Sequence, residues 1–557
     1  MAEWPRGIAD FGYPHDVAEL ADWFLTDEER GNAASQMPAW CEGSRAEPLI
    51  HGSTYFDHLA TEVEALRAGD HLFFTDWRGD PDEKMRDDGP TVGELFCAAA
   101  ERGVVVKGLM WRSHLDKLQY SEEENEHLAD VIEQAGGEVL LDQRVRFGGS
   151  HHQKLVVIRH SDAPERDVAF AGGIDLCHSR RDDASHHGDP QAVQMAERYG
   201  EHPPWHDVQL RVEGPVVGAL DTTFRERWND PAALDMLSPI AWIKDKMRGA
   251  DLTPGRLPEQ PPDPPACGPH AIQVLRTYPD AHFEYDFAPH GERSIARAYN
   301  KVVPLARRLI YLEDQYLWSK RVADLFARAL RDNPDLHLVA VVPRYADVDG
   351  RLQLPPNMIG RRQALETCFE ASRERVHVFD VENHEGTPVY VHAKVCVIDD
   401  IWGCVGSDNL NRRSWSHDSE LSCAVIDSDG DFARDLRLQM LREHLDRAAD
   451  GSADGGLVDP QTAVKEIVAA AEALDAWHAS GRTGPRPPGR LRPHQPERLG
   501  LLTRLWAEPA YRCSTTRMVG RIAIGSRISG ELDRQADGAG DVPRPHPRQP
   551  YLATDSP

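Results

Sequence analysis

The sequence lacks a long hydrophobic run, so it offers no candidate for a membrane-spanning helix. No stretch of the 557 residues approaches the roughly 18 consecutive apolar side chains that such a helix requires. The N-terminus, Met1-Ala2-Glu3-Trp4-Pro5, has no apolar segment after its first charges, which an export signal would carry. We therefore expect a protein that stays in the cytoplasm and that meets any membrane only peripherally.

Paired cysteines and excess positive charge are also missing. The nine cysteines include no Cys-x-x-Cys pair, which argues against a disulfide framework and against a cysteine zinc site. The 63 Lys and Arg residues stand against 91 Asp and Glu, and the net charge is −28. Such an acidic balance disfavours a protein that coats nucleic acid or an anionic lipid surface.

One stretch combines a buried strand with an imidazole and an ammonium group. His392 and Lys394 precede the β-branched run 395–398, which is typical of a buried strand, and Asp399 follows it. Residues two apart on a strand share a face, so both side chains point into the same space. A glycine turn at residues 406–409 then lets backbone approach a ligand closely.

The same pattern occurs earlier in the chain. His152 and Lys154 precede the apolar run 155–158, and a Gly-Gly turn at residues 172–175 closes the strand that follows. A repeated His-x-Lys on equivalent strands predicts two lobes that contribute to one site.

The two motifs resemble the signature of the phospholipase D superfamily, which is His-x-Lys-x-x-x-x-Asp present twice. The second copy, His392, Lys394 and Asp399, fits without exception, whereas the first carries Arg159 where the aspartate is expected. The flanking sequence is similar to the catalytic core of plant and animal-type phospholipases D. Examples are Pro204-Trp205-His206-Asp207-Val208 and Tyr311-Leu312-Glu313-Asp314-Gln315-Tyr316. The resemblance covers roughly residues 45 to 450.

The residue types in the motifs suit phosphodiester chemistry. Lys154 and Lys394 can neutralise the negative charge that develops at phosphorus. One imidazole must be unprotonated to attack phosphorus, and the other must be protonated to supply the leaving alcohol with its proton. The resemblance implies that His152 is the nucleophile and His392 the general acid, with the reverse assignment left open.

A histidine nucleophile needs a carboxylate at its far ring nitrogen. Asp207 and Glu420 each open the strand after a glycine turn, and we predict that they orient the two rings; ordinary strand-end acids are the alternative. Asp399 is counted with the catalytic set as the residue that holds the motif loop. The residues predicted to bind phosphate oxygens or to fix the turns are Gly173, Asp175, Ser407 and Asn409.

Histidine and lysine chemistry requires no metal, and we expect no cofactor. Five histidines lie in or next to the polar loop at residues 182–204, and their spacing matches no metal-ligand pattern. They are His178, His186, His187, His202 and His206.

Alternating helix and strand patterns predict an α/β fold of two similar lobes, each a mixed β-sheet flanked by helices, with one active site at the lobe interface. A chain of 557 residues is also too long for one core. The expected parts are a lead-in (1–47), a first lobe (48–250), a Pro-rich linker (251–268), a second lobe (269–450) and a partly disordered C-terminal extension (451–557).

The resemblance implies an enzyme that cleaves the distal phosphodiester of a glycerophospholipid through a phosphohistidine, or transfers the phosphatidyl group to another alcohol. We expect a monomer that meets its phospholipid at a membrane surface and binds no nucleic acid. Two alternatives stay open. One is a metal-independent nuclease or other phosphodiesterase, which the acidic charge disfavours. The other is an inactive lipid-binding relative, for which Arg159 is the hint.

Overall fold

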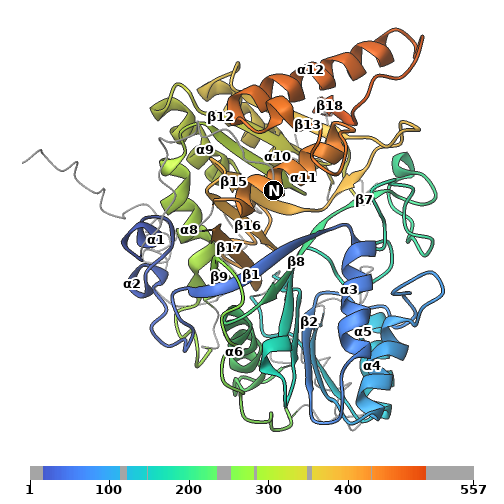
Figure 1. Cartoon of the computed structure of the whole chain (residues 1–557), viewed down its shortest axis with the longest axis vertical. Helices are drawn as coiled ribbons and strands as arrows, with labels where there is room; N and C mark the ends of the chain where they lie inside the picture. Colours follow the sequence, from blue (N-terminus) through green and yellow to red (C-terminus); the bar gives the residue numbers. More distant parts are fainter. Residues whose placement is uncertain are drawn as a thin grey trace, which may run out of the picture.

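The computed structural model describes residues 17–112, 122–146, 149–234, 253–280, 285–347, 354–427 and 430–496. One large mixed β-sheet runs through these residues, with helices packed on it (Figure 1). This arrangement confirms the predicted α/β class. Within the described residues, no helix combines the length and apolar character that crossing a bilayer demands.

The strands of the large sheet are β1 (Cys41–Ile50), β2 (His71–Asp76), β3 (Val105–Trp111), β4 (Glu138–Asp142), β5 (Leu155–Arg159), β6 (Val168–Gly172), β8 (Val208–Glu213), β9 (His270–Tyr278), β10 (Glu292–Arg293), β11 (Leu309–Asp314), β12 (His337–Val341), β13 (Val376–Val381), β15 (Lys394–Ile398), β16 (Trp402–Gly406), β17 (Glu420–Asp427) and β18 (Leu491–Pro493). Two short strands, β7 (Trp205–His206) and β14 (Tyr390–Val391), form a separate parallel pair. The helices are α1 (Val17–Trp23), α2 (Asp27–Arg30), α3 (Gly52–Glu64), α4 (Val92–Glu101), α5 (Glu122–Gln134), α6 (Val216–Trp228), α8 (Ser294–Val302), α9 (Lys320–Asp332), α10 (Leu354–Ala371), α11 (Phe432–His444) and α12 (Pro460–Ala479).

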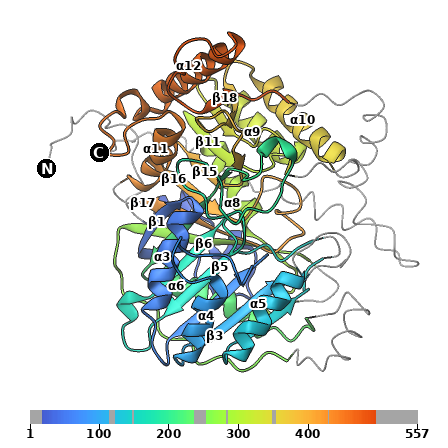
Figure 2. The same ribbon diagram turned by 90° about the vertical axis from the view of Figure 1, so that its right-hand side faces the viewer.

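The strand order is nearly symmetric about its centre, the antiparallel pair of β9 and β1. It runs β18-β13-β12-β11-β15-β16-β17-β9-β1-β8-β6-β5-β2-β3-β4. Outward from the centre, β17, β16, β15, β11, β12 and β13 correspond to β8, β6, β5, β2, β3 and β4. The outer three strands of each series are parallel, and the inner ones antiparallel. Figures 1 and 2 show the first half of the chain largely below the second.

The two motif strands pack helices on both of their faces. In β5, Val157 joins one apolar cluster and Ile158 another, and Val397 and Ile398 divide likewise in β15. One cluster is shared by both halves and contains α6, α11 and α12. On the opposite face, α3, α4 and α5 cover the first half, and α8, α9 and α10 the second. Strands buried on both faces explain the continuous apolar runs.

Some elements of the large sheet and its helices lie outside the two predicted lobes. Strand β1 begins at Cys41, inside the predicted lead-in, and pairs with both β8 and β9. The predicted extension contributes α12, and also β18, which pairs with β13. The disorder predicted at the end of the chain concerns residues 538–557, which lie outside the described part.

The Pro-rich segment does not behave as a free linker where it is described, from residue 253. The Trp228 indole of α6 donates to the Gly255 carbonyl oxygen over 2.8 Å. Arg159 donates to the Pro262 carbonyl oxygen over 2.5 Å. The segment is therefore tied down along α6 and the end of β5, because the carbonyl groups of this helix-poor stretch find side-chain donors there.

Arg159 is a buried structural residue at the place where the first motif lacks its aspartate. Its guanidinium pairs with Asp167 at 2.7 Å and with Asp221 at 3.1 Å. In the second half, Asp399 accepts hydrogen bonds from the backbone N–H groups of residues 307–309. Both residues hold the end of a motif strand, through opposite charges.

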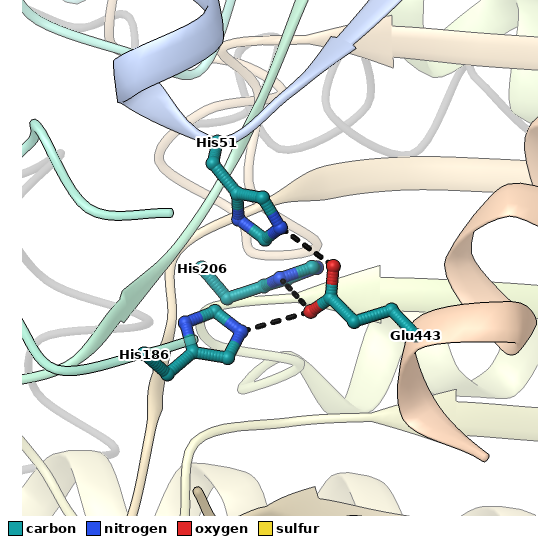
Figure 3. Close-up of side chains that lie close together, drawn as sticks. All are labelled: His51, His186, His206 and Glu443. Atoms are coloured by element: carbon teal, nitrogen blue, oxygen red, sulfur yellow. Dashed lines mark hydrogen bonds and ion pairs between the residues drawn. The ribbon is translucent and has the colours of Figure 1, made fainter. Parts of the chain in front are cut away.

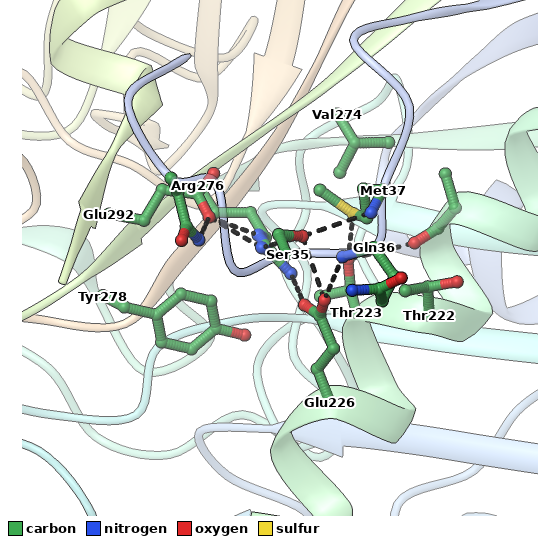
Figure 4. Close-up of polar contacts among 12 residues, drawn as sticks. Ser35, Gln36, Met37, Thr222, Thr223, Glu226, Val274, Arg276, Tyr278 and Glu292 are labelled. Carbon is green, nitrogen blue, oxygen red and sulfur yellow. Dashed lines mark hydrogen bonds and ion pairs between the residues drawn. The ribbon is translucent and has the colours of Figure 1, made fainter. Parts of the chain in front are cut away.

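A buried arginine joins the two halves of the chain near the centre of the sheet. Figure 4 shows Arg276 of β9 between Glu226 of α6 and Glu292 of β10, with 2.6 Å to a carboxylate oxygen of each. The same guanidinium donates to Ser35 Oγ over 3.0 Å, which adds the segment before β1 to the network.

We expect Arg276→Met to lower the free energy of unfolding by about 3 kcal/mol, because it leaves buried carboxylates without their partner. Urea denaturation of the full chain measures the loss. The control is Arg362→Met on α10, whose ion pair with Glu366 is 44% exposed at the arginine side chain and should cost less than about 0.5 kcal/mol. Equal losses in the two variants would contradict the role given to Arg276.

Candidate active site

Each motif histidine is bonded to a carboxylate from the other half of the chain. His392, at the end of β14, has its Nδ1 atom 2.6 Å from Asp207 Oδ2. His152, just before β5, has its Nδ1 atom 2.9 Å from Glu420 Oε2 of β17. The sequence analysis predicts that Asp207 and Glu420 orient the two rings, but it does not say which carboxylate serves which ring. Both contacts occupy Nδ1, so Nε2 is the nitrogen each ring offers to a ligand.

Backbone pairing between the halves produces this crossed arrangement. The parallel pair β7–β14 aligns Trp205 with Tyr390 and His206 with Val391, and so places Asp207 beside His392. An isolated bridge joins His151 to Ser419 and brings Glu420 to His152. Ser407 at the glycine turn donates its hydroxyl to Glu420 Oε2 over 2.5 Å. The two rings are therefore fixed by the same contacts that join the halves.

The two motif lysines have different surroundings. Lys154 Nζ forms an ion pair with Asp175 Oδ1 at 2.9 Å. Asp175 stands three residues after the end of β6, and Asn409, a neutral residue, stands three residues after the end of β16. Across the described residues, no carboxylate lies in ion-pair contact with Lys394 Nζ. Lys394 is thus a buried ammonium group without an ionic partner of its own.

Burial and positive charge keep the motif histidines neutral. Burial, followed by the ammonium groups of Lys154 and Lys394, holds the pKa of His152 well below its usual range. Burial and Lys394 lower the pKa of His392 to about 3. Burial lowers the pKa of Lys394 to about 8, although Asp207 opposes that shift. A bound anion would stabilise the charged forms of all three groups.

The two orienting carboxylates are not equivalent. Burial raises the pKa of Asp207, but the His392 ring and Lys394 outweigh it, and the net pKa falls to about 2. For Glu420, burial and the neighbouring Asp418 raise the pKa well above its usual range. Asp207 is therefore a firm anion, whereas Glu420 is ionised only at a cost.

The four residues predicted to bind phosphate or to fix the turns take different positions. Asp175 forms an ion pair with Lys154, whose charge it balances. Gly173 makes room for Asp207, whose Oδ1 lies 2.2 Å from where a Cβ atom would stand. Ser407 supports Glu420. Asn409 is buried, and its Oδ1 atom has no hydrogen-bond partner among the described residues.

Asp399 does not reach the reacting centre. It follows Ile398, the last residue of β15, so it lies at the other end of this strand from Lys394. Its carboxylate accepts hydrogen bonds from backbone N–H groups. This placement agrees with a loop-holding residue and not with a catalytic one.

Some residues of the site are not predicted from the sequence. Asp76, at the end of β2, shares the surroundings of Asp175, and burial together with Asp175 raises its pKa well above the usual range. The Arg180 guanidinium lies 3.9 Å from the centre of the Trp205 ring, which in turn lies 4.8 Å from the His392 ring. One sequence signal could have indicated Asp76. It is the last residue of the buried strand β2, and Asp314 is the last residue of β11, which has the corresponding place in the sheet.

Comparisons with known proteins agree with this arrangement. The profile described as "Phospholipase D" matches residues 81–248, and "Cardiolipin synthase, PLD-like domain" matches residues 343–443. Phospholipase D alpha 1 of Vigna unguiculata is 23% identical, over 67% of this chain and 61% of that protein. The Ricinus communis protein of the same name is 24% identical with the same coverage. The chain thus spans about three fifths of the length of these curated relatives.

A solved structure shares the fold. The crystal structure of phosphatidylserine synthase from Haemophilus influenzae Rd KW20 superposes with a TM-score of 0.50 at 12% sequence identity, covering 79% of this chain and 96% of that one. Each of the two profile matches contains one His-x-Lys motif, and the sheet holds the two motifs on equivalent strands. Both halves of the chain therefore match profiles of the phospholipase D superfamily.

Proposed function

We propose that the protein is a phospholipase D-type phosphodiesterase that cleaves the distal phosphodiester of glycerophospholipids and can pass the phosphatidyl group to an alcohol. The observation that carries the proposal is the crossed pair of imidazole–carboxylate contacts beside the ammonium group of Lys394, which has no ionic partner among the described residues. A phosphodiester anion supplies the missing negative charge. The relatives named phospholipase D alpha 1 support a phospholipid as the substrate.

The different surroundings of the two histidines support His392 as the general acid and His152 as the nucleophile. Asp207 is a firm anion, so it stabilises an imidazolium at His392, which is what a general acid requires. Burial and the two lysines hold the pKa of His152 well below its usual range, so the ring is neutral, which is what a nucleophile requires, and Glu420 holds it through Nδ1. Both rings are neutral before substrate arrives, and the negative phosphate raises the pKa of His392 until it holds the proton.

In the first step, His152 Nε2 forms a bond to phosphorus and the bond to the leaving alcohol breaks. His392 gives its proton to that alcohol oxygen. Lys154 and Lys394 stabilise the charge on the non-bridging oxygens. In the second step, His392 takes a proton from water or from another alcohol, whose oxygen attacks phosphorus and releases His152. The products are phosphatidic acid or a new phosphatidyl ester.

The direct test is the headgroup exchange reaction. With phosphatidylcholine vesicles and ethanol, we expect phosphatidylethanol and choline, detected by mass spectrometry. His152→Ala and His392→Ala should each reduce turnover at least about 1,000-fold, because both groups act in every cycle. His384→Ala is the control, since that ring is half exposed and pairs with Asp446. Cleavage of single-stranded DNA without lipid turnover would overturn the proposal.

The pH profile tests the state of Lys394. Its pKa of about 8 means that the ammonium form is lost as the pH rises through that value, so kcat/KM should fall above about pH 8. Lys394→Arg keeps a positive charge at every accessible pH. Its residual activity should therefore show no decline near pH 8. An unchanged alkaline limb in Lys394→Arg would assign the decline to another group.

Gly173→Ala tests the position of Asp207. The added methyl group would overlap Asp207 Oδ1 and push the carboxylate away from His392, so kcat should fall about 100-fold. Gly403→Ala on β16 is the control, because the nearest atom to its methyl group is a Phe432 ring carbon at 3.2 Å. Thermal unfolding of both variants separates misplacement from loss of fold. Full turnover in folded Gly173→Ala would contradict the role of Asp207.

A further inference from the structure

A second group of histidines lies next to the site and plays no part in the proposed reaction. His51, His186 and His206 surround the Glu443 carboxylate, and Figure 3 shows the three rings converging on it. His51 lies between β1 and α3, His186 in the loop after β6, His206 in β7, and Glu443 in α11. We refer to these four residues as the histidine cluster. Its histidines belong to the first half of the chain and its glutamate to the second.

The donor atoms of the histidine cluster face a common point. One ligand atom from each residue lies within 4.8 Å of all the others. His51 Nε2 is 2.6 Å from one Glu443 oxygen, and His186 Nε2 and His206 Nδ1 are 2.8 and 3.5 Å from the other. Ligands of a tetrahedral zinc ion are about 3.3 Å apart. The three nitrogen-to-oxygen separations lie on both sides of that value, and the other pairs of donor atoms lie within 4.8 Å, so side-chain shifts would bring the four atoms around one ion.

The outer nitrogens of two rings are already bonded to carboxylates. His206 Nε2 lies 2.8 Å from Glu313, and His186 Nδ1 lies 3.4 Å from Asp182. A neutral imidazole has only one N–H to donate. Both nitrogens of these rings face carboxylates, so the inner side needs either an extra proton on each ring or a metal ion. In zinc sites, a histidine that binds the metal through one ring nitrogen usually donates the N–H of its other ring nitrogen to a carboxylate.

His206 Nδ1 is held less closely than the other donor nitrogens, because its ion-pair contact with Glu443 is 3.5 Å long. The residue is fully buried, and the described residues supply no hydrogen-bond partner for this nitrogen, which points at Glu443. The backbone adds a second observation, because His51 and His186 have positive φ angles of 72° and 55°. Such conformations are costly for residues other than glycine and persist where the surroundings demand them. Here they turn both rings toward the cluster.

We propose that His51, His186, His206 and Glu443 bind a single divalent ion of the zinc type. Imidazole nitrogen with one carboxylate is a donor set that suits zinc, whereas calcium and magnesium prefer oxygen ligands alone. Four protein ligands leave no open position, which is the mark of a structural site. The ion would join α11 to β7 and would fix the chain directly before Asp207, without taking part in the reaction.

The test uses the full-length protein purified without chelators. We expect about one zinc per chain by inductively coupled plasma mass spectrometry, in the ratio a four-ligand site requires. Removal of the metal with dipicolinate should lower the Tm, and zinc should restore it while calcium and magnesium do not. Cobalt loaded into the stripped protein should give the visible absorption of a tetrahedral site. None of these measurements depends on turnover, so they stand apart from the proposed function.

Two variants complete the test. His186→Ala should lose the metal, whereas the neighbouring His187→Ala should keep it, because that ring is 65% exposed and lies outside the cluster. Glu313→Gln should weaken zinc binding about 10- to 100-fold through His206. Wild-type protein that binds no zinc after loading, with a Tm unchanged by chelator, would overturn the proposal. The contacts within the histidine cluster would then be hydrogen bonds from protonated rings. Equal zinc in wild type and His186→Ala would also overturn it.

Discussion

The arrangement of the site depends on two histidine–carboxylate contacts, in each of which one half of the chain supplies the ring and the other half the carboxylate. His392 is oriented by Asp207 and His152 by Glu420, so neither motif has a positioned imidazole without the opposite half. A hydrogen bond of this kind tolerates little displacement. The pairing of β9 with β1, the β7–β14 pair and the buried Arg276 network all serve to hold that alignment.

The repeat is symmetric in its strands and asymmetric in its chemistry. Lys154 has Asp175 as a partner, whereas the corresponding position in the second half is the neutral Asn409. Asp207 is a firm anion and Glu420 is not. These differences give the two copies of the motif unequal surroundings. They arise from side chains outside the His-x-Lys pattern, so the motif alone does not reveal them.

The sequence predicts most of the local structure, because the signals there are local. The apolar runs predicted at residues 155–158 and 395–398 are the strands β5 and β15, which are buried on both faces. The positions of Asp207 and Glu420 after their glycine turns were enough to predict which carboxylates lie beside the rings. Their catalytic roles, and the domain boundaries, stay predictions.

What the sequence does not provide is the partner of each side chain over long separations. Asp175 looks like a ligand to phosphate until the fold sets it against Lys154. The Pro-rich segment looks like a linker until α6 binds its carbonyl groups. The loop histidines match no ligand spacing because two members of the cluster, His51 and Glu443, lie far outside that loop in the chain. Such sets are defined only by packing between distant segments.

The uninterrupted sheet has a consequence for how ligands enter and leave. Strands β17, β9, β1 and β8 are bonded side by side, so the two halves cannot swing apart without breaking a backbone ladder at the middle of the protein. This fold therefore does not allow the hinge motion by which some two-lobed proteins open around a flexible joint. A ligand therefore has to enter and leave the site without a large rotation of one half against the other.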